Sequence, residues 1–317
     1  MGLGAVAILA LPGAHLSDFV MRVATLTCVY AVASTGWTIL GGYANQVSLM
    51  QATMFGLGAY TSTLLFARLH VNPWLGALLG ACVAAFVAAA VGALAFRLRG
   101  HYFALATLAL AEMIRLIVEY AKPITMGSQG VSVPFVVNSF ALLQFPQAKD
   151  YYEIAALLLL ATLVLARYIL HSPLGYRLRA IRDDETAAQL AGTDAFKVKM
   201  QALIIGSMIS ALAGTMYAQI TGFVDPDSVL SITLSVQIAL YAIVGGAQTW
   251  WGALAGTALL YPLGVGLSGS GNSAWSAIER VVYGLILVAM VVVEPRGIAG
   301  FFKRRRVPLR GPQGAAA

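Results

Sequence analysis

The sequence predicts an all-α polytopic membrane protein, a bundle of about ten transmembrane helices. Hydrophobic residues make up 59% of the 317 residues and charged residues only 10%, whereas soluble domains carry about 25% charged residues. Uncharged runs cover residues 23–67 and 228–278, and each is long enough for two crossings of roughly 20 residues. These runs are continuous rather than alternating, which favours helices over a β-barrel.

The expected spans follow the apolar runs in order. They lie at about 1–14, 18–41, 47–67, 73–96, 102–121, 151–170, 198–221, 229–247, 250–267 and 277–295. The first is a short span rather than a signal peptide, because Met1–His15 has no basic residue ahead of its apolar core. We expect one transmembrane domain over residues 1–302 and a basic, disordered tail over 303–317.

Basic residues predict the orientation of these spans. With the tail inside, the loop at Arg97 and Arg99, the segment 167–199 and the segment 296–310 all face the cytoplasm, and they hold 14 of the 20 Lys and Arg residues. Such a bias marks the cytoplasmic side. The tail is expected to anchor on anionic membrane lipid. Residues 122–150 form the longest outside segment and predict a turn-rich lid or plug, with a half-inserted stretch at 131–145.

The segment 171–196 is unlike the rest of the chain because it is rich in charge. Ser172 followed by Pro173 is typical of an N-cap with proline in the first turn. Leu174, Leu178 and Ile181 then form one apolar stripe, and Gly192 is a suitable helix stop. We expect one amphipathic helix of about 17 residues outside the bilayer, serving as a docking surface.

Several function classes are excluded by missing motifs. The chain has no GxxxxGK[ST] loop, HExxH, CxxC or GxSxG, so it is not expected to be an enzyme, to hydrolyse nucleotide or to hold a cofactor. Cys28 and Cys82 lie in apolar runs and predict neither a disulfide nor a metal site. The net charge is +7, but the basic residues are not interleaved with aromatic residues in the way typical of proteins that bind single-stranded nucleic acid. Nucleic acid is therefore not an expected partner.

Two glycine pairs beside amides interrupt the apolar runs, at residues 39–46 and 244–248. Such stretches suit broken or closely packed helices, whose freed backbone groups are tolerated where they line a cavity. They either line a translocation path or only form a hairpin, and their similarity suggests two related halves. The candidate path residues are Gly41, Gly42, Asn45, Gln46, Ser48, Gln51, Gln237, Tyr241, Gly245, Gly246 and Gln248.

Charges within the fifth span are functional candidates, because ionisable groups in a membrane are costly. Glu112 and Arg115 are spaced i, i+3, and Glu119 and Lys122 follow on the same helix. They form either self-satisfied pairs near the outer interface or a proton relay. Residues 225–227, Asp-Pro-Asp, predict an outside turn that offers acidic contacts to a partner protein.

Six stretches together resemble the LivM-type permease of bacterial ABC importers. They are GGYANQVSLMQATMFGLGAYTSTLL, RLRGHYFALATLALAEMIRL, MGSQGVSVP, SPLGYRLRAIRDDETAAQLAGTDAFKVKMQAL, DPDSVLSITLSVQIALYAIVGGAQTWWGALAGTALL and YGLILVAMVVVEPRGIAG. The family serves branched-chain amino acids, and relatives serve urea, short amides and aromatic acids. The resemblance covers residues 30–300, and the block that begins at Ser172 is its most specific part.

The resemblance implies an inner-membrane permease subunit with a cytoplasmic C-terminus. It implies three kinds of partner: a LivH-type permease, two cytoplasmic ATPases that bind ATP and Mg²⁺, and a periplasmic substrate-binding protein. The 171–196 loop would be the coupling helix that docks on an ATPase. The positions that match the family's loop are Gly175, Arg179, Ala180, Arg182, Glu185, Ala187 and Gly192, beside the cap residues Ser172 and Pro173.

Three rival functions remain at this stage. A secondary transporter would be coupled to protons through Glu112 or Glu119 and would work without ATP. A passive channel for urea-like solutes would need no charged docking helix. A structural scaffold would not need the glycine–amide stretches.

Overall fold

The computed structural model describes residues 17–98, 100–135, 140–268, 285 and 297–300. The α-helices are α2 Asp18–Trp37, α3 Gln51–Leu69, α4 Pro73–Ala95, α5 His101–Tyr120, α6 Lys122–Thr125, α7 Ala148–His171, α8 Pro173–Asp183, α9 Glu185–Leu190, α10 Ala195–Thr221, α11 Pro226–Val229, α12 Ile232–Gly245 and α13 Gly252–Ser268. A π-helical turn η2 (Thr38–Gly42) extends α2, and two short 3₁₀ turns, η3 (Gly127–Gln129) and η4 (Phe140–Leu142), lie between α6 and α7.

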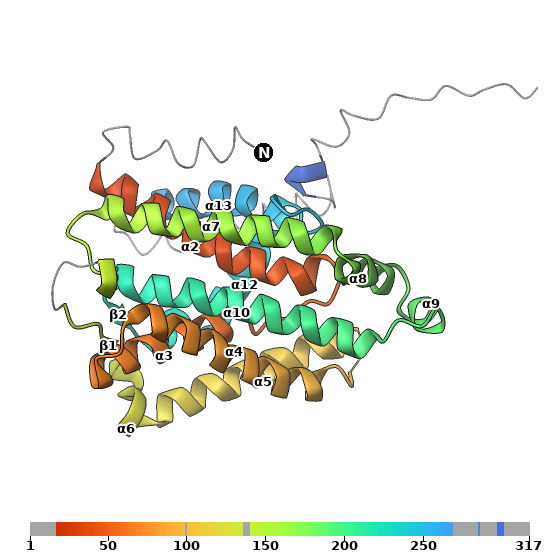
Figure 1. Ribbon diagram of the computed structural model, residues 1–317, viewed down its shortest axis with the longest axis horizontal. Coiled ribbons are helices and arrows are strands. Elements are labelled where there is room, and N and C mark those ends of the chain that lie inside the picture. Colours follow the sequence, from red (N-terminus) through yellow and green to blue (C-terminus); the bar gives the residue numbers. More distant parts are fainter. Residues whose placement is uncertain (1–16, 99, 136–139, 269–284, 286–296, 301–317) are drawn as a thin grey trace, which may run out of the picture.

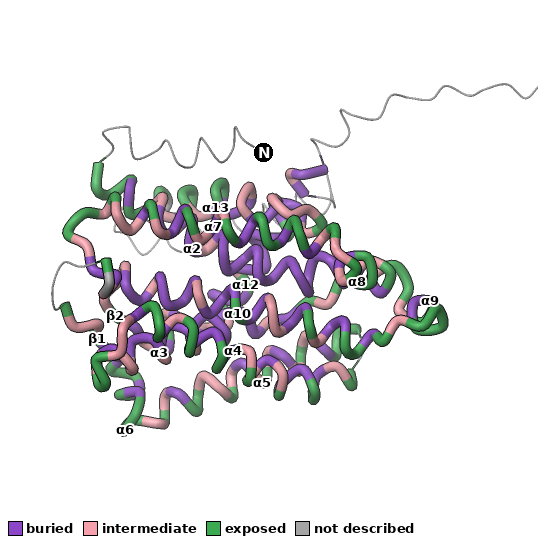
Figure 2. The backbone as a smooth tube through the Cα atoms, viewed as in Figure 1, coloured by how far each residue is buried: buried purple, intermediate pink, exposed green. Residues whose placement is uncertain are grey.

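The long helices lie side by side along one direction (Figure 1). Helix α10 is central and packs against α3, α4 and α2, while α2 also contacts α7, and α12 pairs with α13. Helices α8 and α9 project at one end of the bundle, and α6 with the two strands lies at the other (Figure 1). We call these the α8 end and the sheet end. The burial pattern in Figure 2 shows the core running along α2, α10 and α12.

Six helical segments in the described part of the chain are long and apolar enough to cross a membrane: 18–42, 73–95, 101–120, 148–171, 195–221 and 226–245. Each coincides with an expected span. Helices α3 and α13 match two more expected spans but are not among the six. The expected span 1–14, the tail 303–317 and, apart from residue 285, the expected span 277–295 lie outside the described residues. The chain is a multi-pass helical membrane protein, and the count of about ten stays a prediction.

Small residues let the central helices approach closely. A Cβ placed at Gly214 of α10 would overlap the backbone carbonyl of Phe55 in α3, and one at Gly36 of α2 would lie 2.7 Å from the Gly206 carbonyl of α10. Membrane helices associate through such close backbone packing, since burial from water does not drive them together. Glycine at these positions therefore sets the core of the bundle.

The sheet end also holds a small antiparallel ribbon, which the sequence did not predict. Strand β1 (Val131–Ser132) pairs with β2 (Phe223–Val224) in the register Val131–Val224. The ribbon ties the expected lid to the C-terminal end of α10, and the Val133 amide adds a hydrogen bond to the Gly222 carbonyl at 2.9 Å. Two-residue strands lack the 4–8-residue pattern by which a strand is found in sequence. The all-α class is confirmed, and the ribbon is a local addition to it.

Candidate functional site

The candidate residues fall in three regions: the α8–α9 segment, the two glycine–amide stretches, and a charged cluster on α5.

The corner between α7 and α8 is built by Ser172, Gly175 and Arg179. The Ser172 hydroxyl donates to the Ile169 carbonyl at 2.7 Å and accepts from the Gly175 amide at 3.4 Å. A side chain at Gly175 would overlap the Ile169 carbonyl. The N-cap predicted at Ser172 is confirmed, and glycine is required for the sharp turn.

Arg179 fixes the same corner from the other side. Its guanidinium donates to the Leu170 carbonyl at 3.2 Å and to the Gly175 carbonyl at 3.3 Å, and it stacks over the Tyr176 ring at 4.5 Å. The bond to Leu170 satisfies a carbonyl at the C-terminus of α7, where the last carbonyls of a helix have no partner within it. Arg179 therefore joins α8 directly to the C-terminal end of α7.

The expected single helix of about 17 residues is wrong, because it breaks at Asp184. Asp184 is extended (φ −157°, ψ 113°), ends α8, and caps α9 by accepting from the Thr186 and Ala187 amides at 2.8 and 2.9 Å. An aspartate side chain competes for backbone amides in this way and favours caps over helix interiors. The apolar stripe is confirmed, since Leu178 and Ile181 are buried.

A buried ion pair that sequence reasoning missed fixes α9 on α10. Lys199 of α10 is buried, and its ammonium lies 2.7 Å from the Glu185 carboxylate. A buried lysine needs such a partner. The spacing of the two residues gave no periodic signal, so only the fold brings them together.

The remaining loop residues form the surface that α8 and α9 present to solvent. Arg182 is half-buried and holds Asp183 through two hydrogen bonds of 3.0 and 3.1 Å. Leu190 is 86% exposed, and Tyr176 is also exposed. The other candidates at this surface are all exposed: Pro173, Ala180, Ala187 and Gly192. This projecting surface has a charged part and an apolar part, which suits contact with another protein.

The two glycine–amide stretches meet each other in the structure. A Cβ at Gly42 would overlap the Ala247 carbonyl, so the two backbones are in contact there. Residues 43–50 are not helical, as expected of a broken helix. Their backbone is supported by the Trp37 indole, which donates to the Ser48 carbonyl at 2.8 Å, and by Thr107, which accepts from the Leu49 amide at 3.1 Å.

Most candidate path residues are in the packed interior. Gln51 is buried and donates to the Gly206 carbonyl at 3.3 Å and to the Ser210 hydroxyl, so it joins α3 to α10. The buried candidates are Gly41, Gly42, Ser48, Gln51, Tyr241, Gly245 and Gly246, the half-buried ones are Gln46 and Gln237, and the exposed ones are Asn45 and Gln248. In this single subunit the stretches therefore act first as packing elements.

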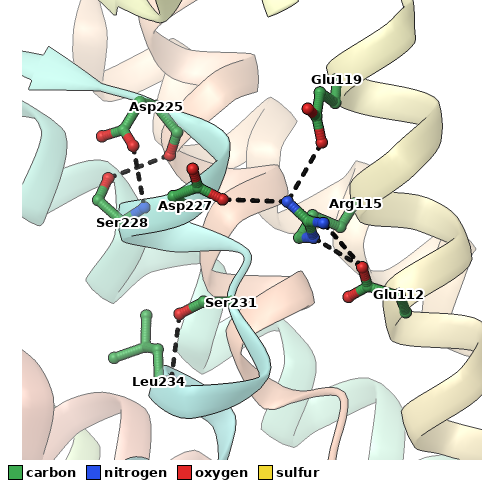
Figure 3. Close-up of polar contacts among 8 residues, drawn as sticks. All are labelled: Glu112, Arg115, Glu119, Asp225, Asp227, Ser228, Ser231 and Leu234. Atoms are coloured by element: carbon green, nitrogen blue, oxygen red, sulfur yellow. Dashed lines mark hydrogen bonds and ion pairs between the residues drawn. The ribbon is translucent and has the colours of Figure 1, made fainter. Parts of the chain in front are cut away.

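The charged residues of α5 form a cluster that reaches α11 (Figure 3). Arg115 pairs with Glu112 at 2.8 Å, with Glu119 at 3.2 Å and with Asp227 at 3.0 Å. The predicted pair of Glu112 and Arg115 is confirmed, whereas Glu119 binds Arg115 and not Lys122. Asp227 was expected to contact a partner protein. Its place beside Arg115 is a contact between elements far apart in the sequence.

The cluster carries surplus negative charge along the half of α5 nearer the sheet end. Three carboxylates surround one guanidinium, and the Asp227 side chain is 83% exposed. With a rise of about 1.5 Å per residue, Glu112 lies about 2 Å, Arg115 about 7 Å and Glu119 about 13 Å from the midpoint of α5. The cluster therefore runs from the middle of α5 to the sheet end, where Asp227 lies in the first turn of α11. The Glu112 side chain, near the midpoint, is 32% exposed, and charge at that depth cannot face hydrocarbon at low cost. This face of α5 and α11 must border water or another polar surface.

Among the described residues, no group of three or more His, Cys, Asp or Glu could hold a metal ion. Cys28 is buried, and Cys82 is exposed on α4. The three regions instead suit a membrane protein that docks a partner at one end and presents a charged face in mid-span.

Comparisons with known proteins identify the family of the chain. Residues 19–291 match the family model of the branched-chain amino acid transport system permease component. The chain is 26% identical to the high-affinity branched-chain amino acid transport system permease protein LivM of Escherichia coli K12, over 87% of this chain and 69% of that protein.

Two further relatives are similar over most of the bundle. The permease protein LivH of Salmonella typhimurium is 25% identical, over 87% of this chain and 92% of that protein. The probable LivM of Methanocaldococcus jannaschii is 24% identical, over 67% of this chain and 64% of that protein. These relatives are transport permeases and not enzymes. The chain belongs to the family of branched-chain amino acid transport system permease components.

Proposed function

We infer that this permease subunit of an ABC importer carries branched-chain amino acids, or other small amino acids, across the bacterial inner membrane. The observation that carries the inference is the family match over residues 19–291, together with the names of the LivM and LivH relatives. Residues 1–302 act as one permease domain. The subunit pairs with a LivH-type permease and receives substrate from a periplasmic binding protein at the sheet end.

The α8–α9 segment is the proposed docking surface for the ATPases, which bind the ATP and Mg²⁺. The α8 end is then cytoplasmic, as is the C-terminus. Support comes from the projection of α8 and α9 beyond the bundle (Figure 1) and from their rigid attachment. Arg179 ties α8 to α7, and Lys199 with Glu185 ties α9 to α10. Closure of the ATPases would therefore rotate both flanking helices and switch the side to which the path opens.

The translocation path is proposed to begin along the α5–α11 face. The charge on this face supports the placement, because Glu112 near the midpoint of α5, Arg115 and the exposed Asp227 at the sheet end are compatible with water and not with lipid. At the α8 end the path would reach Asn45 and Gln248, the exposed amides of the two glycine–amide stretches. The buried glycines would then set the width of the path by packing, without contacting solute.

Uptake in cells that carry or lack this gene tests the proposed substrate. We expect labelled leucine to accumulate only with the gene present and with ATP available. Labelled urea and a benzoate-like acid serve as comparison solutes, because a permease of the same architecture could carry amides or aromatic acids. Leucine uptake that collapses with the proton gradient but survives ATP depletion would support the proton-coupled alternative and overturn the importer assignment.

A second experiment tests the docking surface. Arg182→Glu and Ala187→Glu place acids on α8 and α9, where the parent side chains are half-buried and exposed. Gly175 is unsuitable, because any side chain there would collide with α7 and prevent folding. We expect both variants to fold, to lose co-purifying ATPases and to lose uptake. The matched control is Ser128→Glu, an exposed position of η3 at the sheet end; ATPase retention by the α8–α9 variants would contradict the docking assignment.

A further inference from the structure

An apolar cavity of about 480 Å³ lies between α4, α7, α10 and the η4 turn. It is separate from the α8–α9 surface and from the charged cluster on α5. Its walls are almost entirely hydrocarbon, with Trp74 and Leu78 from α4, Leu157 from α7, Met216 from α10 and Phe140 from η4. The lining hydroxyl of Thr215 is engaged, because it donates to the Gly58 carbonyl at 3.2 Å. The cavity therefore fits an apolar molecule.

The cavity runs along the membrane-spanning helices from the sheet end. Helices α4, α7 and α10 all belong to the six candidate spans. Trp74, in the first turn of α4, lines the cavity together with Phe140. Its indole donates to the Phe140 carbonyl at 3.1 Å, and its ring lies 5.5 Å from the Phe140 ring. Tryptophan is typical of the membrane–water interface, because its side chain combines a large apolar ring with one polar atom. From there the lining on α7 extends from Ile154 to Ala161, about 10 Å at 1.5 Å per residue.

The cavity is open sideways, toward the surface that the helices present to the membrane. Leu78 and Leu157 at its rim are 61% and 58% exposed, whereas Met216 at its base is 4% exposed. The rim continues into the exposed apolar side chains of α4 and α7, such as Phe86 and Val164. In a spanning helix an apolar outer surface of this kind faces acyl chains. Lipid therefore surrounds the opening of the cavity.

We propose that this cavity binds one acyl chain of a phospholipid from the leaflet at the sheet end. The chain would enter between Leu78 and Leu157 and contact Met216 at the base. A head group would lie near the start of α7, where Lys149 and Glu153 precede Leu157 by two turns and one turn on the same helix face. The Lys149 side chain is half-exposed, and its ammonium lies 3.9 Å from the Glu153 carboxylate, which is too far for a hydrogen bond. Lys149 can therefore approach a lipid phosphate. The proposal concerns binding alone and does not depend on which solute is carried.

Native mass spectrometry of the purified full complex tests the proposal. Reconstitution in nanodiscs of phosphatidylethanolamine and phosphatidylglycerol supplies the probe lipids. We expect one phospholipid to remain bound to the permease at activation energies that remove the rest. Ala161→Phe fills the cavity from an exposed position of α7 and should abolish that retention. Ala90→Phe is the matched control, because Ala90 is exposed on α4 and does not line the cavity.

A second measurement covers the case in which a variant folds poorly. Phospholipids with brominated acyl chains quench the fluorescence of nearby tryptophan side chains. The quenching of Trp74 is obtained as the difference in quenched fluorescence between the parent protein and the Trp74→Phe variant. We expect strong quenching of Trp74 in the parent and weaker quenching in Ala161→Phe. Equal lipid retention and quenching in all variants would overturn the proposal. So would a cross-link from Leu157→Cys to a second protein subunit, because the cavity would then be a protein interface.

Discussion

Two faces of the helix bundle lie at similar depth and carry opposite chemistry. Phe86, 77% exposed, lies near the middle of α4, in the face formed by α4 and α7. Glu112 and Arg115 lie near the middle of α5, in the face that α5 forms with α11. Hydrocarbon tolerates an apolar side chain such as Phe86 but not charged side chains such as Glu112 and Arg115. The side-chain chemistry at mid-span therefore shows what each face borders. One face borders lipid, and the other borders water or protein.

The comparison is tested most strongly by placing the same charge on both faces. Phe86→Lys puts an ammonium at the middle of α4. It should make the free energy of membrane insertion of this helix less favourable by about 2.5–3.5 kcal/mol. Leu116→Lys, on α5 between Glu112 and Glu119, should cost far less, because three carboxylates are close by. The measurement is the yield of folded protein and its thermal unfolding in nanodiscs. Equal destabilisation of the two variants would remove the distinction between the faces.

The next largest effect is expected from removing the central cation of the cluster. Arg115→Leu leaves three carboxylates without their shared partner. It removes the charged hydrogen bonds to Glu112 and Glu119, whose side chains are 32% and 33% exposed, so solvent screening reduces the loss below the value of about 1.5–3 kcal/mol for a buried charged bond. We expect uptake to be lost and the thermal unfolding temperature to fall. Arg115→Lys, the control, keeps the charge and should retain partial uptake. Full uptake by the leucine variant would show that the cluster has no role in the path.

A smaller effect is expected at the exposed carboxylate. Asp227→Asn removes one ion pair whose acid is 83% exposed, and exposed pairs contribute about 0–1 kcal/mol. Stability should therefore hardly change, whereas the uptake rate should fall if this face lines the path. Asp225→Asn is a poor control, since Asp225 caps α11 through the Ser228 amide at 3.1 Å. An unchanged rate in Asp227→Asn would place the path elsewhere.

Cysteine labelling probes the two faces without disturbing stability. Cys82 is exposed on α4, in the apolar face, while Cys28 is buried. Only the thiolate reacts, and it does not form in hydrocarbon, so a water-soluble thiol reagent should leave the parent protein unlabelled. The Leu116→Cys variant should be labelled by the same reagent. Labelling of the parent protein at Cys82 as fast as labelling of that variant would contradict a lipid-facing α4.

The sequence predicted the helices well, because each span is long and its apolar run is uninterrupted. The segments 18–41, 73–96 and 198–221 coincide with helices to within a few residues. The cap at Ser172 was also predictable, since Ser-Pro at a helix start has a local cause in backbone amide capping. The break at Asp184 was missed, although an aspartate pair inside an expected helix is a local signal for a second cap.

Contacts between distant elements could not be predicted. Lys199 and Glu185 lie on different helices, and Arg115 and Asp227 are 112 residues apart. The two glycine–amide stretches were recognised by their composition, but that Gly42 rests on the backbone of Ala247 follows only from the fold. The two-residue strands β1 and β2 likewise exist because the lid meets the end of α10.

The sequence by itself therefore determined that the chain is a helical membrane protein with a charged segment between two spans, because span length and charge distribution are local properties of the chain. The tertiary structure alone decided which faces carry charge at mid-span, which glycines are contact points, and where an apolar cavity opens between α4, α7 and α10. Those features depend on the rotation and depth of each helix relative to its neighbours. In a membrane these are set by close packing of small residues and by polar contacts between helices, which composition does not encode.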